Sequence, residues 1–217
     1  MKELEQSYRR RYERLLIPTA TRLEGFLRDC LSAELRIDRI TARAKAVDRF
    51  IEKAQRQVNG APKYNDPLNQ IQDQVGARIV TYYADDVPCV ANAAETYLRH
   101  IESRILAPES EFEFGYFGKH YIMLFPVDVV PDPGPDLPPF FELQIATLFQ
   151  HAWSEANHDL GYKPGHVLTS EQKRKLAFTA AQAWGADLIF NELHAQARSA
   201  GAVVQADLPI TEAATEN

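Results

Sequence analysis

The spacing of hydrophobic residues along the chain predicts helices and strands in alternation from its start. Residues 2 to about 33 carry apolar side chains near helical spacing, including Leu4 and Tyr8, which predicts one long helix. Residues 36–45 place isolated apolar residues between charged ones and are expected to be extended. The pattern becomes helical again over residues 46–58, so the chain begins as helix, strand and helix.

The middle of the chain is richer in strand patterns. A loop with glycine, proline and asparagine leads to the β-rich stretch 77–84, and residues 86–105 resemble a helix. Two strands are expected near 111–117 and 119–126, followed by a proline-rich loop. The alternating stretch 140–146 predicts one more strand.

Two helices are expected after the last strand, over residues 147–162 and 170–197. Strands and helices that alternate irregularly predict an α+β fold, in which helices flank a mixed sheet of about five strands. Long helices are expected at both ends. We expect a single domain over residues 1–200 and a disordered tail over 201–217.

Composition and charge restrict the classes of function. The chain has 217 residues, 45% of them hydrophobic, which is enough for a packed core. No apolar run reaches the ~18 residues of a membrane span. The two cysteines, Cys30 and Cys89, lack metal or redox spacing and are expected to be buried packing residues in a cytoplasmic protein. A net charge of −6 argues against extensive nucleic-acid binding but permits a local basic pocket.

Two carboxylates occur where strand patterns make them unusual. Alternation in "FFELQIA" separates Phe141 from Glu142 and Gln144, which share one face. Such a carboxylate faces either solvent or a ligand. Asp73 precedes a strand that contains Arg78. Together, Asp73 and Glu142 could hold a magnesium ion, which typically takes one or two carboxylates plus phosphate oxygens.

Cations gather at the first junction between strand and helix. Arg43 and Lys45 approach the junction, and Lys53 and Arg56 lie three residues apart on the expected helix. Cations beside a helix N-terminus suit a phosphate group, although a solvated charged helix explains them as well. The chain contains no GxxxxGK[ST] sequence, so a nucleotide site here is not a P-loop.

Two further stretches carry candidate chemistry. The segment "EFGYFGKHYIMLFP" interrupts a strand pattern with glycines, aromatic residues, a lysine and a histidine, whereas a hairpin would need only the glycines. The helix 147–162 places His151, Glu155 and His158 on roughly one face, a weak signal for a metal site. The other histidines show no matching pattern.

Five of these stretches, in order, resemble the synthetase domain of the RelA/SpoT family, which makes (p)ppGpp alarmones. They are "RAKAVDRFIEKA", "DQVGARIV", "GYFGKHY", "FELQIAT" and "QHAWSEANHDLGYK", and they cover residues 40–165. Each is weak alone, but five in the right order are specific. The resemblance implies a nucleotidyltransferase-like fold and a small single-domain synthetase.

The resemblance also implies a reaction and its residues. ATP would transfer pyrophosphate to the 3′-hydroxyl of GDP or GTP with Mg²⁺ as cofactor. Asp73 and Glu142 match the catalytic and metal-binding carboxylates. The residues expected at ATP are Arg43, Lys45, Lys53 and Arg78, with Arg56 as an addition.

The glycine-rich stretch corresponds to the acceptor side of the family's site. Tyr116 takes the place of the tyrosine that stacks on the acceptor base, and His120 matches the histidine that lines the pocket. Gln144 and His151 are expected on the same side. Lys119 is an additional cation there, although strand geometry would point it away from His120.

The chain departs from the family pattern mainly on this acceptor side. Phe117 replaces a polar residue, Gly118 a serine, Ala146 an arginine and Asn157 a glutamate. These changes leave three hypotheses open: an alarmone synthetase, a toxin that pyrophosphorylates the 3′ CCA end of tRNA, and a non-catalytic member that binds nucleotide or a partner. An antitoxin protein and a homo-oligomer are further candidate partners.

Overall fold

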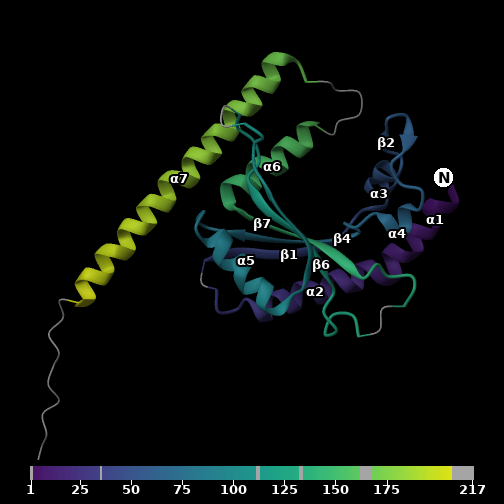
Figure 1. Ribbon diagram of the computed structural model, residues 1–217, viewed down its shortest axis with the longest axis horizontal. Helices are drawn as coiled ribbons and strands as arrows, with labels where there is room; N and C mark the ends of the chain where they lie inside the picture. The colour runs from purple at the N-terminus through teal and green to yellow at the C-terminus, as the bar shows by residue number, and fades with distance from the viewer. Residues whose placement is uncertain (1, 35, 111–112, 132–133, 162–167, 207–217) are drawn as a thin grey trace, which may run out of the picture.

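A five-stranded mixed sheet lies at the centre of the protein, with helices on both faces (Figure 1). The computed structural model describes residues 2–34, 36–110, 113–131, 134–161 and 168–206. The strand order is β1-β4-β7-β6-β5. Strands β4 and β7 are parallel, and the other neighbours are antiparallel. The predicted α+β fold with a mixed sheet is confirmed.

Alternation along the strands gives the sheet one apolar and one polar face. The strands are β1 (Ile37–Ala44), β4 (Val75–Thr81), β5 (His100–Leu106), β6 (Gly118–Leu124) and β7 (Phe140–Thr147). Ile79, Leu143 and Ile145 are fully buried on one face of the inner strands. Arg78 and Gln144 alternate with them, so their side chains project from the opposite face.

Helices from the first half of the chain cover the apolar face. The predicted long N-terminal helix is confirmed and consists of α1 (Lys2–Arg11), the π-helical turn η1 (Tyr12–Leu16) and α2 (Ile17–Cys30). Leu16, Leu23 and Leu27 are buried at helical spacing and pack into the core. Helix α5 (Asp86–Tyr97) adds Val90 and Ala94 to the same core.

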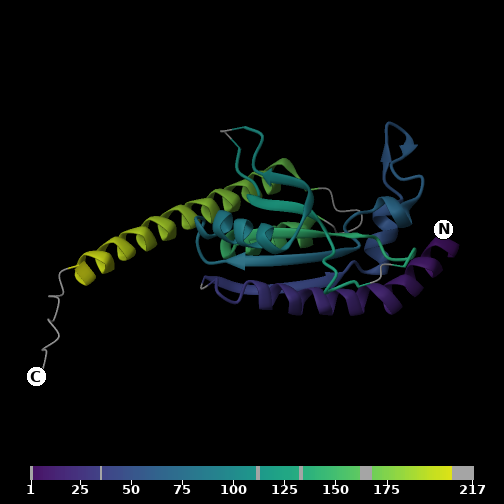
Figure 2. The same cartoon turned by 60° about the horizontal axis from the view of Figure 1, so that its bottom comes forward.

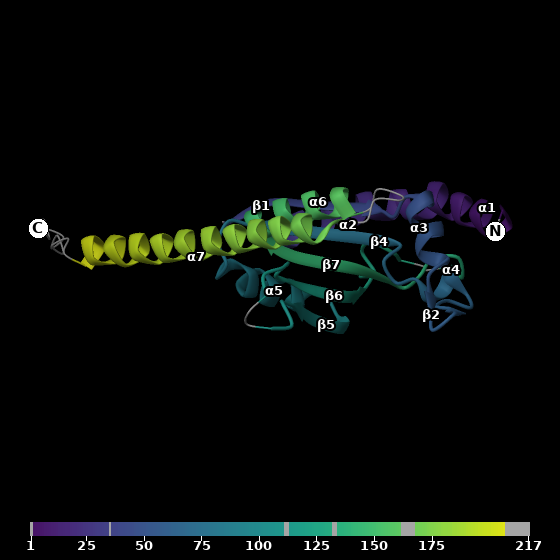
Figure 3. The same cartoon turned by 90° about the horizontal axis from the view of Figure 1, so that it is seen from above.

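The polar face is partly covered by the last two helices. Helices α6 (Leu148–Gly161) and α7 (Ser170–Ala206) lie on the opposite side of the sheet from α1 and α2 (Figure 2). Helix α7 runs past α6 and projects beyond the sheet (Figure 3). It continues to Ala206, past its predicted end and into the expected tail, of which residues 207–217 lie outside the described residues.

Two predictions for the segment between α5 and β6 are wrong. The helix expected over 86–105 ends at Tyr97, and β5 pairs with β6 at the edge of the sheet. No strand forms over residues 113–117, which belong to the first of the two expected strands, while residues 111–112 lie outside the described residues. Because Ile101 and Ile105 are 51% and 66% exposed, β5 lacks the burial that normally reveals a strand.

The helix expected over 46–58 is shorter than predicted. Helix α3 (Val47–Ala54) is followed by a small hairpin of β2 (Gln57–Val58) and β3 (Ala61–Pro62), and by α4 (Pro67–Gln70). Asn59 and Gly60 connect the two short strands with positive φ angles of 54° and 79°. Such angles are typical of a two-residue hairpin turn, so the Asn-Gly pair ends the helical segment.

The described residues also answer two questions raised by composition. Within them, no helix combines the length and apolar character that crossing a bilayer requires. The cysteines are not buried as expected, since Cys30 is half-buried and Cys89 is exposed.

Candidate active site

A row of polar side chains crosses the whole sheet on its polar face. Strand pairing places one residue from each strand in line: Thr41, Arg78, Gln144, His120 and Arg104. Residues directly opposite each other on neighbouring strands project from the same face. The register therefore brings together residues that lie far apart in the sequence.

A second row lies directly beside the first. It contains Arg43, Gly76 and Glu142, which are paired across β1, β4 and β7. A Cβ atom added to Gly76 would have no atom within 4 Å. The space above Gly76 is therefore open, and it is bordered by a cation on one strand and a carboxylate on another. This arrangement suits phosphate groups.

Asp73 and two lysines form one corner of the site. The Lys45 and Lys53 ammonium groups lie 3.0 and 2.7 Å from the same Asp73 carboxylate oxygen, Oδ2. Burial acts to raise the pKa of Asp73, but the two ammonium groups outweigh it, so the pKa lies below its usual value. Asp73 is therefore ionised at neutral pH.

The N-terminal helix supports this corner. The Tyr8 hydroxyl donates a hydrogen bond of 2.8 Å to the backbone carbonyl of Lys45. The Tyr8 ring stacks on Phe50 of α3 at 3.6 Å between centroids. Arg11 donates to Gln74 Oε1, next to Asp73 in the chain. Arg11 is therefore buried against this corner of the site.

Glu142, His120 and Tyr116 form a continuous chain of contacts. His120 Nδ1 lies 3.3 Å from Glu142 Oε1, and His120 Nε2 lies 3.1 Å from the Tyr116 hydroxyl. Burial acts to raise the pKa of Glu142, but His120 outweighs it and the pKa is lowered. Burial raises the pKa of Tyr116 to about 12. Glu142 is thus ionised beside a neutral phenol.

Gly118 allows Tyr116 to occupy this position. A Cβ atom added to Gly118 would lie 2.3 Å from the Tyr116 hydroxyl oxygen and 2.7 Å from its Cζ atom. Real Cβ contacts are longer than this, so a side chain at residue 118 would displace the ring. Gly118, where the resemblance implies a serine, therefore leaves room for the Tyr116 ring to lie down onto the strand.

Arg78 connects the sheet to α6. Its guanidinium group donates to Gln144 Oε1 at 3.0 Å and to Glu155 Oε1 at 2.6 Å. It also lies 3.1 Å from His151 Nδ1. Because arginine can only donate, His151 accepts at Nδ1 and is the neutral tautomer. Burial, together with the charge of Arg78, lowers the pKa of His151.

These contacts bear on two metal hypotheses. The guanidinium of Arg78 contacts both His151 and Glu155, which argues against a metal on that helix face. Among the described residues, no group of three histidine, cysteine or carboxylate side chains could hold a metal ion. Asp73 differs, because its buried Oδ1 atom has no hydrogen-bond partner. A carboxylate pair with a spare oxygen fits magnesium, which needs few protein ligands when phosphates supply others.

Two predicted site residues are not placed as expected. The Lys119 ammonium group lies 3.6 Å from Glu95 of α5, on the sheet face opposite to His120. Its assignment to the acceptor side is wrong, because alternation along β6 separates the two side chains. Arg56 follows the end of α3, so it does not share a helix face with Lys53 as expected. Its role at ATP stays a prediction.

Several contacting residues could not be found from the sequence. Tyr8 and Arg11 lie more than thirty residues before their partners, so helical spacing identified them only as core and surface residues. The sequence suggested Glu155 only as a candidate metal ligand and gave no sign of its contact with Arg78. Gln150 gave no signal, although its side chain accepts a hydrogen bond from the Phe117 amide.

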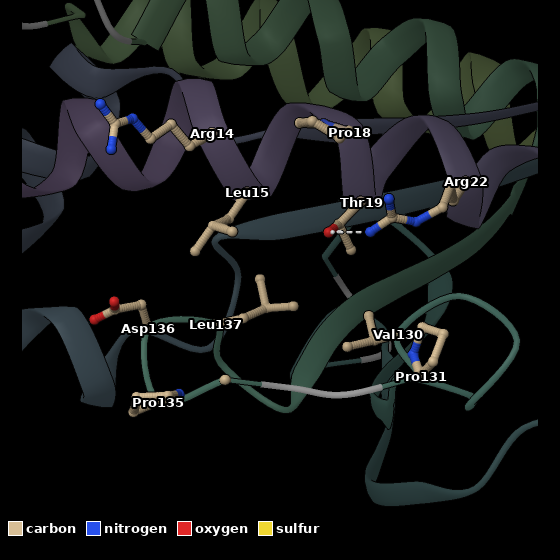
Figure 4. A pocket seen from close by; sticks show the side chains of 11 residues that line it. Arg14, Leu15, Pro18, Thr19, Arg22, Val130, Pro131, Pro135, Asp136 and Leu137 are labelled. Carbon is tan, nitrogen blue, oxygen red and sulfur yellow. Dashed lines mark hydrogen bonds between the residues drawn. The ribbon is translucent and has the colours of Figure 1, made fainter.

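A hollow of about 320 Å³ lies outside this site (Figure 4). It is formed by α2, η1 and the loop after β6, with Leu15, Thr19, Val130 and Leu137 among the lining residues. None of the residues described above lines it, so the chemistry is assigned to the polar face of the sheet.

Comparisons with known proteins identify similar sequences and folds. Residues 42–167 match the family model for the region found in RelA/SpoT proteins. Small alarmone synthetase 1 from Bacillus subtilis bound to its product pppGpp is 25% identical, with a TM-score of 0.63 over 90% of this chain and 96% of that one. The same enzyme bound to AMPCPP is 22% identical, with a TM-score of 0.61 over 91% of this chain and 97% of that one.

A third structure extends the similarity to another organism. A GTP pyrophosphokinase family protein from Streptococcus pneumoniae is 24% identical, with a TM-score of 0.66 over 93% of this chain and 96% of that chain. A search of curated proteins finds no match. The predicted nucleotidyltransferase-like fold with long terminal helices agrees with these structures.

Proposed function

The chain belongs to the RelA/SpoT family and is an enzyme of the pyrophosphotransferase class, and we propose that it makes (p)ppGpp-type alarmones from ATP and GDP or GTP. In this reaction the 3′-hydroxyl of the acceptor attacks the β-phosphorus of ATP. The bond between that phosphorus and the oxygen that bridges to the α-phosphate breaks, and AMP leaves.

One observation carries this proposal: the predicted ATP and acceptor residues meet on one face of the sheet at Glu142. The open space above Gly76 separates Arg43 from Glu142, and the Lys45–Lys53–Asp73 corner lies beside the same strand end. On the other side of Glu142, His120 contacts Tyr116. The phosphate chain of ATP could therefore bind on one side of the Glu142 carboxylate, and the acceptor base on the other.

The side chains present fit the chemistry of the transfer. Arg43, Lys45 and Lys53 supply positive charge where phosphate oxygens become more negative. Glu142 is ionised and could accept the proton from the attacking hydroxyl, with His120 holding its orientation. Tyr116 offers a flat ring on which the acceptor base could stack.

Magnesium is the proposed cofactor. Asp73, through its unpartnered Oδ1 atom, and Glu142 would hold the ion. The charge of Asp73 acts to raise the pKa of Glu142, as a second carboxylate at the same site does. The bound ion would neutralise charge on the ATP phosphates.

The bound ligands of the related structures support the choice of substrates. The B. subtilis enzyme binds the ATP analogue AMPCPP in one structure and its product pppGpp in another. The acceptor of this chain is a separate question, because Phe117, Gly118 and Ala146 depart from the family pattern around Tyr116.

The test uses ATP labelled at the γ-phosphate, with magnesium and one of GDP, GTP, excess ATP or bulk tRNA. Label on a guanosine nucleotide is the expected result. The variant Glu142→Ala serves as the inactive control, and its folding is checked by thermal unfolding. Magnesium is then removed with a chelator and restored, which should abolish and recover transfer.

Other outcomes select the alternatives. Label on tRNA would overturn the alarmone proposal in favour of a tRNA-modifying toxin, while label on ATP alone would indicate an adenosine alarmone. Absence of transfer to every acceptor would favour a non-catalytic member. An antitoxin partner and a homo-oligomer stay predictions.

A further inference from the structure

The loop that carries Tyr116 has few anchors in the sheet. Residues 113–117 belong to no strand, and β6 begins only at Gly118. Tyr116 itself contacts His120. Two further contacts of this loop lead away from the sheet toward α6 and α7, so its position depends on helices as well as on strands.

The first contact is a path of buried hydrogen bonds. The Phe117 amide donates to Gln150 Oε1 at 3.1 Å, and Gln150 Nε2 donates to Asp187 Oδ2 at 3.1 Å. The Thr147 hydroxyl donates to the same Asp187 oxygen at 2.8 Å. The three side chains are between 3% and 7% exposed. The path therefore runs from the acceptor loop through α6 to the middle of α7.

Asp187 determines which way the Gln150 amide points. A carboxylate oxygen accepts hydrogen bonds, so the NH₂ group of Gln150 must face Asp187. The carbonyl oxygen of Gln150 then faces the Phe117 amide, which needs an acceptor. Without Asp187, the side-chain amide of Gln150 could rotate by half a turn. Its NH₂ group would then face the Phe117 N–H, and two donors would lie opposite each other. Little water reaches Asp187, which is 7% exposed, and this burial also raises the pKa of its carboxyl group.

The second contact is aromatic. The rings of Phe114 and Trp184 lie 5.8 Å apart at an angle of 58°. Trp184 and Asp187 are three residues apart on α7, so they lie on neighbouring parts of its surface. Helix α7 lies outside the residues matched by the family model, which end at 167. The contacts thus join the matched region to a helix beyond it.

We propose that Asp187 is a positioning residue for the acceptor: through Gln150 it fixes the Phe117 amide and thereby the place of the Tyr116 ring. The inference rests on the proposed function, because that function makes Tyr116 an acceptor contact. Trp184 supports the other end of the same loop through Phe114. Changes at Asp187 or Trp184 should therefore affect the acceptor and leave ATP binding unchanged.

The test compares Asp187→Ala with Asp187→Asn, which keeps an oxygen that can accept both hydrogen bonds. Trp184→Ala is a second variant at a half-exposed position, where loss of folding is not a concern. Phe178→Ala, on the exposed side of the same helix, is the matched control. Two quantities are measured: the KM values for acceptor and ATP, and the hydrogen exchange rate of the Phe117 amide.

We expect Asp187→Ala to raise the acceptor KM about 3- to 10-fold, which corresponds to the loss of one hydrogen bond, and to leave the ATP KM unchanged. Protection of the Phe117 amide should be lost in Asp187→Ala and restored in Asp187→Asn. Trp184→Ala should raise the acceptor KM, and Phe178→Ala should not.

Three results would overturn the inference. One is an unchanged Phe117 exchange rate in folded Asp187→Ala, a second is an equal effect on ATP and acceptor, and a third is a failure of Asp187→Asn to restore the acceptor KM. If the wild-type protein transfers no pyrophosphate, the proposed function fails instead. The exchange experiment would then still decide whether Asp187 holds the loop.

Discussion

Gly118 is the residue whose replacement should be most informative about the acceptor side. In Gly118→Ala, the new methyl group would lie 2.3 Å from the Tyr116 hydroxyl, so the ring must swing away and lose its contact with His120. The end of a side chain moves more easily than backbone, and the fold should survive. We expect the acceptor KM to change by roughly 3- to 10-fold and the ATP KM to stay constant in steady-state assays.

Gly25→Ala provides the control, because a Cβ atom there has no neighbour within 4 Å. An acceptor KM that is the same in wild type and Gly118→Ala would show that the folded-down position of Tyr116 is irrelevant to acceptor binding.

His151 should make stability depend on pH. Burial and the charge of Arg78 lower its pKa from the ordinary value of 6.5, while Glu155 and Asp38 oppose this and Arg39 adds to it. As pH falls below 6.5, the unfolded chain binds a proton that the folded protein does not, so stability falls. We expect His151→Gln to flatten the pH dependence of urea unfolding between neutral pH and about pH 5.

His158→Gln, on the same helix, is the control. It shows how far the loss of any one histidine of α6 changes the pH dependence of unfolding. If His151→Gln and wild type lose stability in parallel as pH falls, His151 is not held in its neutral form.

At the residue scale, unusual placement in a pattern was enough to single out some candidate site residues. A carboxylate inside an apolar strand pointed to Glu142, and a glycine-rich interruption drew attention to the stretch in which the family resemblance then suggested roles for Tyr116 and His120. Asp187 gave no such signal, because an acidic residue in a long polar helix is ordinary. Its burial arises only from the packing of α7 on α6, which no local pattern encodes.

At the scale of elements, the N-terminal helix should contribute to ATP binding without touching ATP. In Tyr8→Phe, the ring still stacks on Phe50, but the Lys45 carbonyl loses its hydrogen-bond donor. A buried acceptor without a partner costs about 1–2 kcal/mol. We expect that loss in the free energy of urea unfolding, together with a higher KM for ATP and an unchanged acceptor KM.

Tyr12→Phe is the matched control, since Tyr12 lies one turn further along the same helix, its ring contacts that of Tyr8, and its hydroxyl makes no hydrogen bond with a described residue. Equal losses of stability in the two variants would show that the Tyr8 hydroxyl does not hold Lys45 in place.

Elements with a buried apolar side were predictable, and those without one were not. Strands β4 and β7 were found because alternation separates their buried and polar faces. Strand β5 is exposed along most of its length, and only its pairing with β6 makes it a strand. Local sequence cannot encode a pairing that depends on a partner strand more than ten residues away.

At the scale of the whole molecule, the net charge of −6 hides an uneven distribution. The polar sheet face carries Arg43, Arg78 and Arg104, with Lys45 and Lys53 at its edge. Cations thus gather where a nucleotide would bind, although Lys45 and Lys53 share Asp73 and Arg78 is paired with Glu155. Away from this face, exposed cations also form ion pairs, as Arg9 does with Glu5 and Lys175 with Glu171.

This charge distribution predicts how reversing charges far from the site should affect the KM for the acceptor. Lys173 and Arg174 are exposed at the start of α7, within the basic run "EQKRKL". A free nucleotide binds within the sheet face, so Lys173→Glu with Arg174→Glu should leave the KM for GDP or GTP within about twofold of wild type, with weak dependence on salt. If the acceptor were tRNA, its phosphates would need such cations, and the same change would weaken use of the acceptor steeply as salt rises. Transfer assays at low and high salt, with both acceptors, therefore distinguish a nucleotide acceptor from tRNA by a property of the whole surface.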